Sequence, residues 1–435
     1  MTPSKKLHIG MSLAPTWLSG DAWRRADSGV EGLYGSDFYL DVALRAEQAK
    51  LDFAFLPDSL FLNTGLLASG TGFASLDPTL LLASIARETS RIGLLSTAST
   101  TFFPPYIVAR QIQSLNWLSN GRAGWNIVTA LDGNANFGLS EMPSPEERYA
   151  RAAEFTEVVR LLWESFPYEA LKLDRESGLF ADAELVKPVD HEGSFFNVKG
   201  PLNLPRFGKT RIPLVQAGAS GAGRDFASSV ADAIFASTPD KAAAMDLRAD
   251  LRKRAEQRGR KGDDIRVLPG LSLYLAPTRA EAEELFAETN ARVSRDRCLA
   301  TVLEMTGLDL CDWPAKRQVK ATDLPPPPET VRSRTHSQLL RRMIERDEPA
   351  VEDLLCRPEV IGSAHWLVVG TPSDAVAQIM DWAAAGAIDG FVAFPGGSLD
   401  AVRLLLEQVV PALGDLGLFR KDYSGSTFFE HLTQE

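Results

Sequence analysis

With 435 residues, 45% of them hydrophobic, the chain is long enough for one large core or for two domains. Its formal net charge of −11 argues against a nucleic-acid partner, because a phosphate backbone would repel an acidic protein. The apolar runs are too short to span a bilayer and the N-terminal residues lack a signal-peptide pattern, so we expect a cytoplasmic enzyme without membrane contact.

Strand-like and helix-like segments alternate in the first part of the chain. Strands are expected at 7–13, 52–58, 91–100 and 124–130, and helices at 36–50, 77–90, 104–119 and 144–166. Two of these helices carry clear start signals. Asp77 is an N-cap residue followed by Pro78, and Ser144 with Glu147 three residues later is typical of a capping box.

Four further strands, each followed by a helical pattern, are expected in the rest of the chain, at 212–219, 231–237, 265–276 and 388–394. Eight strand–helix units, several of whose strands are apolar on both faces, predict an α/β fold of the TIM-like (β/α)8 barrel type. A plain barrel needs about 250 residues. We therefore expect a single domain over 1–435 with long insertions near 59–76, 167–211 and 297–365, and a hairpin at GSFFNVKGPLNLP in the second of them.

Polar residues gather where the strands end, which is where such barrels carry their chemistry. They are Asp58, Ser96, Thr97, Ser99, Asn126, Thr129, Gln216 and Ser220, with Gly218 beside them and Pro395, Gly396 and Gly397 at the end of the eighth strand. This short and mostly neutral set suits a flat ligand with carbonyls and ring nitrogens, or a phosphate, more than a metal. The three cysteines and five histidines also show no metal-ligand spacing, so no metal site is expected.

The stretch LVQAGASGAGRDFASSVA joins a strand to a helix through a turn of small residues. Gly218, Ser220 and Gly221 would leave backbone N–H groups open at the helix N-terminus, which favours a phosphate site, and Arg224 could add a charge. A tight turn shaped only by packing is the alternative. A Rossmann fingerprint is a weaker interpretation, because the glycine order is GxxGxG rather than GxGxxG.

Simpler roles remain open for the other candidates. Asp58 could cap the turn that follows it, Thr97 could be an ordinary strand residue, and Tyr149 could be a packing aromatic. Asn126 lies within an apolar strand, where an unpaired buried amide is costly. It needs a partner, either a neighbouring strand or loop, or a ligand.

The run SNGRAGWNIVTA resembles the S-x-GR-x-xWN-x-VT signature of the nitrilotriacetate and dibenzothiophene-sulfone monooxygenase family, which belongs to the bacterial-luciferase-like FMN-dependent monooxygenases. Other segments agree with the family in order and spacing. They are AWRRAD (22–27), DFAFLPDSL (52–60), FFPPYIVAR (102–110), ERYARAAEF (147–155), PLVQAGASGAGRDFA (213–227), VGTPSDAVAQ (369–378) and GLFRKDYSGSTFFEHL (417–432). The resemblance covers nearly the whole chain.

The resemblance implies a TIM-like barrel that uses reduced FMN as a co-substrate, supplied by a separate NAD(P)H:flavin reductase. Dioxygen would react at carbon 4a of the flavin, and the resulting peroxide would oxidise a small organic substrate. Relatives are commonly homo-oligomers. Carried over by position, the flavin contacts would be Asp58, Thr97, Tyr149 and Ser220 with the adjoining Gly218 and Gly221, and Asn126 from the shared WN motif. One departure is Pro145, because relatives carry a histidine four residues before the tyrosine.

The substrate is expected to be neutral or heteroaromatic, such as a sulfone or a flavin-like heterocycle of the riboflavin-lyase type. The stretches 11–20 and 59–76 contain no charged residue, and both should border the site. The segments 59–76 and 167–211 are the two candidates for a lid over it. An aminopolycarboxylate, the alternative within the family, would call for Arg and Lys. A non-catalytic flavin-binding protein and an NAD(P)-dependent oxidoreductase are further alternatives. No catalytic acid or base is assigned.

Overall fold

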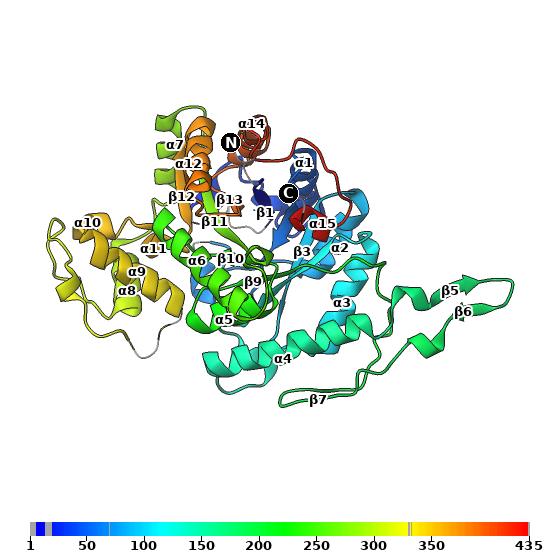
Figure 1. Cartoon of the computed structure of the whole chain (residues 1–435). Helices are drawn as coiled ribbons and strands as arrows, with labels where there is room; N and C mark the ends of the chain where they lie inside the picture. The colour runs from blue at the N-terminus through cyan, green and yellow to red at the C-terminus, as the bar shows by residue number, and fades with distance from the viewer. Residues whose placement is uncertain (1–5, 14–19, 69, 329–330, 332, 434–435) are drawn as a thin grey trace.

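The computed structural model describes residues 6–13, 20–68, 70–328, 331 and 333–433, and part of the uncharged stretch 11–20 lies outside these residues. Its centre is a closed barrel of eight parallel strands (Figure 1). In spatial order the barrel strands are β10 (Ala233–Ala236), β9 (Leu214–Ala217), β4 (Ala123–Val128), β3 (Gly93–Ser99), β2 (Phe53–Leu56), β1 (His8–Ser12), β13 (Gly390–Pro395) and β11 (Arg266–Leu275). The pairing of β10 with β11 closes the ring. The predicted TIM-like (β/α)8 fold is therefore confirmed.

Helices surround the barrel, and their starts follow the sequence signals. The main surrounding helices are α1 (Ser36–Gln48), α2 (Pro78–Glu88), α3 (Pro105–Leu118), α4 (Pro145–Glu164), α5 (Gly221–Val230), α6 (Lys241–Gln257), α7 (Arg279–Thr289), α12 (Pro372–Ala384), α13 (Leu399–Leu404) and α14 (Val410–Asp415). The Asp77 carboxylate accepts the Leu80 amide at 2.9 Å, and the Ser144 hydroxyl accepts the Glu147 amide at 3.1 Å. Both predicted N-caps are therefore formed, but among the described residues the Glu147 side chain does not return the bond to the Ser144 amide, so the predicted capping box is incomplete.

A ninth strand, β12 (Trp366–Gly370), was not among the eight expected ones. The ten-residue β11 pairs with β10 through its first half and with β12 through Leu271–Leu275 in its second half. Because β10 ends at Ala236, the outer half of β11 would otherwise leave its backbone groups unpaired. The short WLVVG run supplies those partners, directly after the segment expected to be an insertion.

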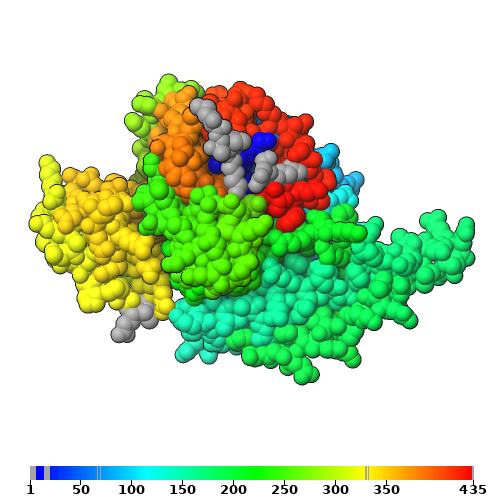
Figure 2. Space-filling view, viewed as in Figure 1, coloured from blue at the N-terminus to red at the C-terminus, as the bar shows by residue number. Residues whose placement is uncertain are grey.

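The segment 167–211 forms two antiparallel hairpins. The first, β5 (Leu171–Asp174) with β6 (Leu179–Ala181), projects from the body of the molecule (Figures 1 and 2). The second pairs β7 (His191–Glu192) with β8 (Asn197–Val198), so the expected hairpin is present but begins earlier than its predicted stretch. The Glu154 carboxylate of α4 accepts the Phe196 amide at 2.8 Å and so attaches this hairpin to the barrel.

The segment 297–365 contributes most of a group of helices at the opposite side of the molecule (Figures 1 and 2). These helices are α8 (Arg295–Thr306), α9 (Arg334–Asp347), α10 (Val351–Leu354) and α11 (Pro358–Ile361). They bury a core of their own that includes Val302, Leu340 and Ile344. The segment 59–76 includes a 3₁₀ turn, Thr64–Leu66, near the end of β2.

The C-terminal helix α15 (Phe428–Thr433) closes the N-terminal end of the barrel. The fully buried Phe428 ring lies 5.2 Å from the Phe53 ring, centroid to centroid. Gly93 and Gly124, near the starts of β3 and β4, leave room for it, because a Cβ at either would fall 2.6 Å or 2.4 Å from the Phe428 ring. The open end of the barrel is therefore the C-terminal one.

No helix within the described residues is both long and apolar enough to cross a membrane.

Candidate functional site

Thr97 and Asn126 form a buried pair inside the barrel. They are register partners on β3 and β4, and the Asn126 amide nitrogen donates to the Thr97 hydroxyl at 3.0 Å. That hydroxyl donates to the Leu56 carbonyl at 2.7 Å. Trp125, next to Asn126, packs outward with its ring 5.8 Å from that of Phe155 on α4, so the alternation of the strand directs Asn126 into the barrel.

One atom of this pair lacks a partner. The Oδ1 atom of Asn126 is buried and accepts no hydrogen bond from the described residues. A buried, unpaired carbonyl oxygen costs about 1–3 kcal/mol, so its retention needs a reason. The neighbouring strand therefore satisfies the Asn126 amide nitrogen, and the amide oxygen is left as an acceptor for a ligand.

The turn between β9 and α5 forms an open cradle next to Tyr149. Ser220 caps α5, because its hydroxyl accepts the Gly223 amide at 3.2 Å. A Cβ at Gly218 would lie 3.2 Å from the Tyr149 hydroxyl and one at Gly223 only 2.7 Å from it, while a Cβ at Gly221 would meet no atom within 4 Å. Gly218 also has a φ of +124°, which few other residues adopt. The backbone conformation therefore favours glycine at Gly218, and a Cβ at Gly223 would displace the Tyr149 hydroxyl.

The Tyr149 hydroxyl has no hydrogen-bond partner in the described part of the chain. It faces the start of α5, where the first N–H groups have no acceptor within the helix. Arg224 contributes less than expected, because it donates to the Ala219 carbonyl at 2.8 Å and to the Asp250 carboxylate at 2.9 Å. Free donors at a helix N-terminus suit a phosphate.

Asp58 follows β2 and is half-buried. Its carboxylate accepts the amide of the adjacent Ser59 at 2.9 Å, a contact to the next residue only, so the simpler interpretation of Asp58 as a turn cap stays a prediction. Burial raises the pKa of Asp58 to about 6, against the opposing effect of the Ser59 N–H, and the nearby Asp77 carboxylate raises it further. The structure shows no hydrogen bond from Asp58 to Thr97, Asn126 or Tyr149.

The structure thus joins Tyr149, Gly218, Ser220 and Gly221 into one group and Thr97 with Asn126 into another. Pro145 is the first residue of α4, and its side chain offers neither the donor nor the acceptor of the imidazole that relatives carry at this position. Sequence reasoning placed Gln216 among the polar residues at the strand ends but did not name it as a flavin contact, although it lies in an apolar strand as Asn126 does. Its Nε2 donates to the Ala217 carbonyl at 2.6 Å and its buried Oε1 accepts no hydrogen bond within the described residues.

Aromatic residues inside the barrel were also missed. The ring of Phe55 lies 5.7 Å from that of Phe235, and Phe235 lies 5.5 Å from both Phe394 and His365. Their strand positions are adjacent to the polar pair, since the residue after Phe55 supplies the carbonyl that accepts the Thr97 hydroxyl. Phe55, Phe235 and Phe394 therefore belong to an apolar, aromatic cluster inside the barrel.

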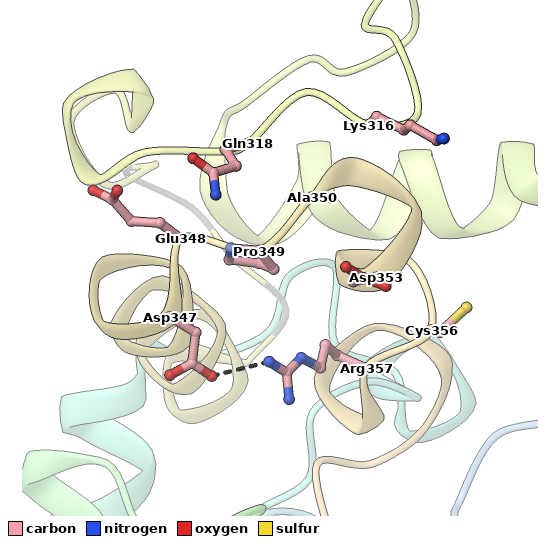
Figure 3. Close-up of a pocket in the computed structure, with 9 residues that line it drawn as sticks. All are labelled: Lys316, Gln318, Asp347, Glu348, Pro349, Ala350, Asp353, Cys356 and Arg357. Carbon is pink, nitrogen blue, oxygen red and sulfur yellow. Dashed lines mark hydrogen bonds and ion pairs between the residues drawn. The ribbon is translucent and has the colours of Figure 1, made fainter.

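A cleft of about 660 Å³ lies elsewhere, within the segment 297–365 (Figure 3). It is lined by Lys316, Gln318, Asp347, Glu348, Pro349, Ala350, Asp353, Cys356 and Arg357. Arg357 donates to the Asp347 carboxylate at 3.0 Å, so its central charges neutralise each other. None of the predicted site residues lines this cleft. Among the described residues, no group of three or more His, Cys, Asp or Glu side chains is arranged to hold a metal.

Comparison with known proteins shows which family the barrel belongs to. Residues 24–388 match the family described as luciferase-like monooxygenase. N-acetyl-S-(2-succino)cysteine monooxygenase of Bacillus subtilis (strain 168) is 34% identical, with 100% of this chain and 98% of the relative covered. Dibenzothiophene-sulfone monooxygenase of Rhodococcus erythropolis (strain XP) is 33% identical, with 99% and 97% covered. The crystal structure of riboflavin lyase with modified FMN and riboflavin superposes with a TM-score of 0.83 at 28% identity, covering 98% of this chain and 96% of that one.

Proposed function

The chain belongs to the luciferase-like monooxygenase family and is an FMN-dependent oxidoreductase, and on that premise we propose that it is the oxygenating component of a two-component monooxygenase. Reduced FMN would come from a separate NAD(P)H:flavin reductase, and dioxygen would be the oxidant. The substrate would be a small neutral or heteroaromatic compound, such as a sulfone or a flavin-like heterocycle.

The unpartnered polar atoms around the barrel mouth carry this proposal. Asn126 Oδ1 is a buried acceptor that receives no donor from the described part of the chain, and it fits a ring N–H of a flavin. The Tyr149 hydroxyl and the first N–H groups of α5, before Gly223, have no acceptor among the described residues, and they fit the FMN phosphate. One molecule with a flat, N–H-bearing ring at one end and a phosphate at the other would satisfy both groups.

The residues of this chain would then bind, orient and shield the cofactor. When bound, reduced FMN supplies the electrons that activate dioxygen. Ser220 shapes the phosphate cradle by capping α5, and Thr97 fixes the Asn126 amide in one orientation. The side chains of Phe55, Phe235 and Phe394 would exclude water from the side of the flavin ring that faces the barrel interior. Asp58, with a pKa raised to about 6, can exchange a proton near neutral pH, although no catalytic step is assigned to it.

A neutral substrate is supported by the aromatic interior and by the uncharged stretch 59–76. One observation favours the alternative of a polycarboxylate. Arg148 and Arg151 of α4 donate to the carbonyls of Ala130 and Thr100, which follow the C-terminal ends of β4 and β3, and neither forms an ion pair within the described residues. The relative named for N-acetyl-S-(2-succino)cysteine acts on a molecule with several carboxylates. Arg148 and Arg151 would be the residues to bind them.

Turnover with a substrate panel tests the choice. The protein would be mixed with NADH, FMN and a flavin reductase, and with dibenzothiophene sulfone, riboflavin, nitrilotriacetate or N-acetyl-S-(2-succino)cysteine. We expect product from the neutral heterocycles. Oxidation of the polycarboxylates alone, abolished by Arg148→Met, would overturn the neutral assignment. Tight NADH binding without flavin, or tight binding of oxidised FMN without any oxygen reaction, would favour the two non-monooxygenase alternatives.

A further inference from the structure

We infer that His365 is a substrate-binding residue, which forms a hydrogen bond with a polar atom of a flat, neutral ring compound held against the aromatic interior of the barrel. This inference rests on the proposed function and adds a residue and a recognition mode to it.

His365 occupies the interior of the barrel although it comes from far along the chain. It directly precedes β12, where the segment 297–365 returns to the barrel. Its ring lies 4.7 Å from that of Phe394 on β13 and 5.5 Å from that of Phe235 on β10. Gly270 of β11 makes room for it, because a Cβ at that position would fall 2.8 Å from the imidazole. The surrounding strands therefore hold the ring in one place.

His365 differs from the other four histidines, because among the described residues it has no hydrogen-bond partner. His8 contacts the Asp52 carboxylate at 3.3 Å, His191 the Glu154 carboxylate at 3.1 Å, and His431 donates to the Arg91 carbonyl at 2.7 Å. His336 bonds to the Ser333 hydroxyl and the Ser363 carbonyl. Neither ring nitrogen of His365 has such a partner in the described part of the chain, and the residue is only half-buried. Its donor and acceptor are therefore available to a ligand.

The chemistry of His365 selects the kind of ligand. Burial, with a smaller effect of the nearby His336, lowers the pKa of His365 to about 3, so the imidazole is uncharged at neutral pH. An uncharged imidazole offers one N–H donor and one nitrogen acceptor but no charge to balance a carboxylate. Phe235 and Phe394 offer ring faces and edges beside it. A planar ring carrying a neutral acceptor, such as a sulfone oxygen or a ring carbonyl, satisfies both features.

The test compares two probes of the same shape, dibenzothiophene sulfone and fluorene, which has a CH₂ group where the sulfone has SO₂. Binding would be measured by quenching of tryptophan fluorescence. We expect the wild type to prefer the sulfone. His365→Phe should weaken sulfone binding about 10-fold, the value of one hydrogen bond, and leave fluorene binding unchanged. His365→Gln, which keeps a donor and an acceptor and is the milder change for folding, should recover part of the loss. Phe235→Leu is the matched control and should weaken both probes equally.

Two results would overturn the inference: a His365→Phe variant that keeps the sulfone preference, or a wild type that shows no preference or binds neither probe. The oxygen reaction of bound reduced FMN should be the same in the wild type and in both His365 variants. Its absence from the wild type would count against the proposed function, whereas the probe comparison reports on His365 alone.

Discussion

Replacement of Tyr149 by phenylalanine isolates the proposed phosphate contact. The change removes the hydroxyl that faces Gly218 and Gly223 and keeps the ring, whose centroid lies 6.0 Å from that of Phe226. Because the hydroxyl has no partner in the described chain, the free protein loses no hydrogen bond. The effect of Tyr149→Phe should therefore appear in ligand binding and not in stability.

The size of the effect follows from the charge of the ligand. A hydrogen bond to a charged group contributes about 1.5–3 kcal/mol, so the dissociation constant of FMN should rise about 10- to 150-fold. Riboflavin has the same ring without a phosphate, and its affinity should stay within about twofold of that for the wild type, because the difference lies below about 0.5 kcal/mol. The ratio of the two affinities therefore reports on the phosphate contact alone.

The assay is anaerobic titration of the protein with reduced FMN and reduced riboflavin, followed by fluorescence. Equal losses for both flavins would show that Tyr149 acts on the whole pocket and not on the phosphate. An unchanged FMN affinity would refute the assignment of this hydroxyl. The melting temperature of the variant should match that of the wild type, which excludes a general loss of structure.

Three further substitutions, the first with a matched control, test the phosphate cradle, the base of the barrel and Asp58. Gly223→Ala should abolish the preference for FMN over riboflavin, since its Cβ would lie 2.7 Å from the Tyr149 hydroxyl. Gly221→Ala keeps its N–H and its Cβ would meet nothing within 4 Å, so this control should retain the preference. Equal behaviour of the two variants in the same titration would argue against a steric cradle. Phe428→Ala should lower the free energy of unfolding by about 3–5 kcal/mol in urea denaturation, because it empties the base of the barrel; a loss below about 1 kcal/mol would contradict the role of α15. The raised pKa of Asp58 means that its protonated form favours folding below the unfolded pKa and that this contribution is lost as the pH rises through about 6. Asp58→Asn should therefore be more stable than the wild type by about 1 kcal/mol at pH 8, allowing for partial exposure, and no more stable at pH 4; thermal melts at the two pH values that show no such difference would refute a buried, destabilised carboxylate.

Local patterns in the sequence were sufficient for most of the barrel. The eight apolar runs with their helix caps each lie within a short window, and the caps at Asp77 and Ser144 form as their residue types predict. The strand β12 was not predicted, because its five residues follow a long helical segment and are too few to show a clear period-two pattern. Its strand character follows from the unpaired half of β11, which only the folded chain reveals.

In the candidate site, too, the parts built from consecutive residues were predictable and the contacts between distant segments were not. The Gly218–Gly221 turn was predictable, because a strand, small residues and a helix start are consecutive in the sequence. That Thr97 supports Asn126 depends on the register of two strands, which the sequence does not specify. His365 could not be found from the sequence, since its neighbours Phe235, Gly270 and Phe394 come from three distant strands.

The reaction of bound reduced FMN with oxygen is the most direct test of whether this chain is a flavin-dependent monooxygenase. The protein would be loaded anaerobically with reduced FMN and mixed with oxygenated buffer in a stopped-flow spectrometer that records near-ultraviolet absorbance. We predict a transient that outlives the oxidation of free reduced FMN and that decays faster when an oxidisable heterocycle is present. Oxidation at the rate of free flavin, without a transient and with no response to any member of the substrate panel, would contradict the assignment of this chain as a flavin-dependent monooxygenase.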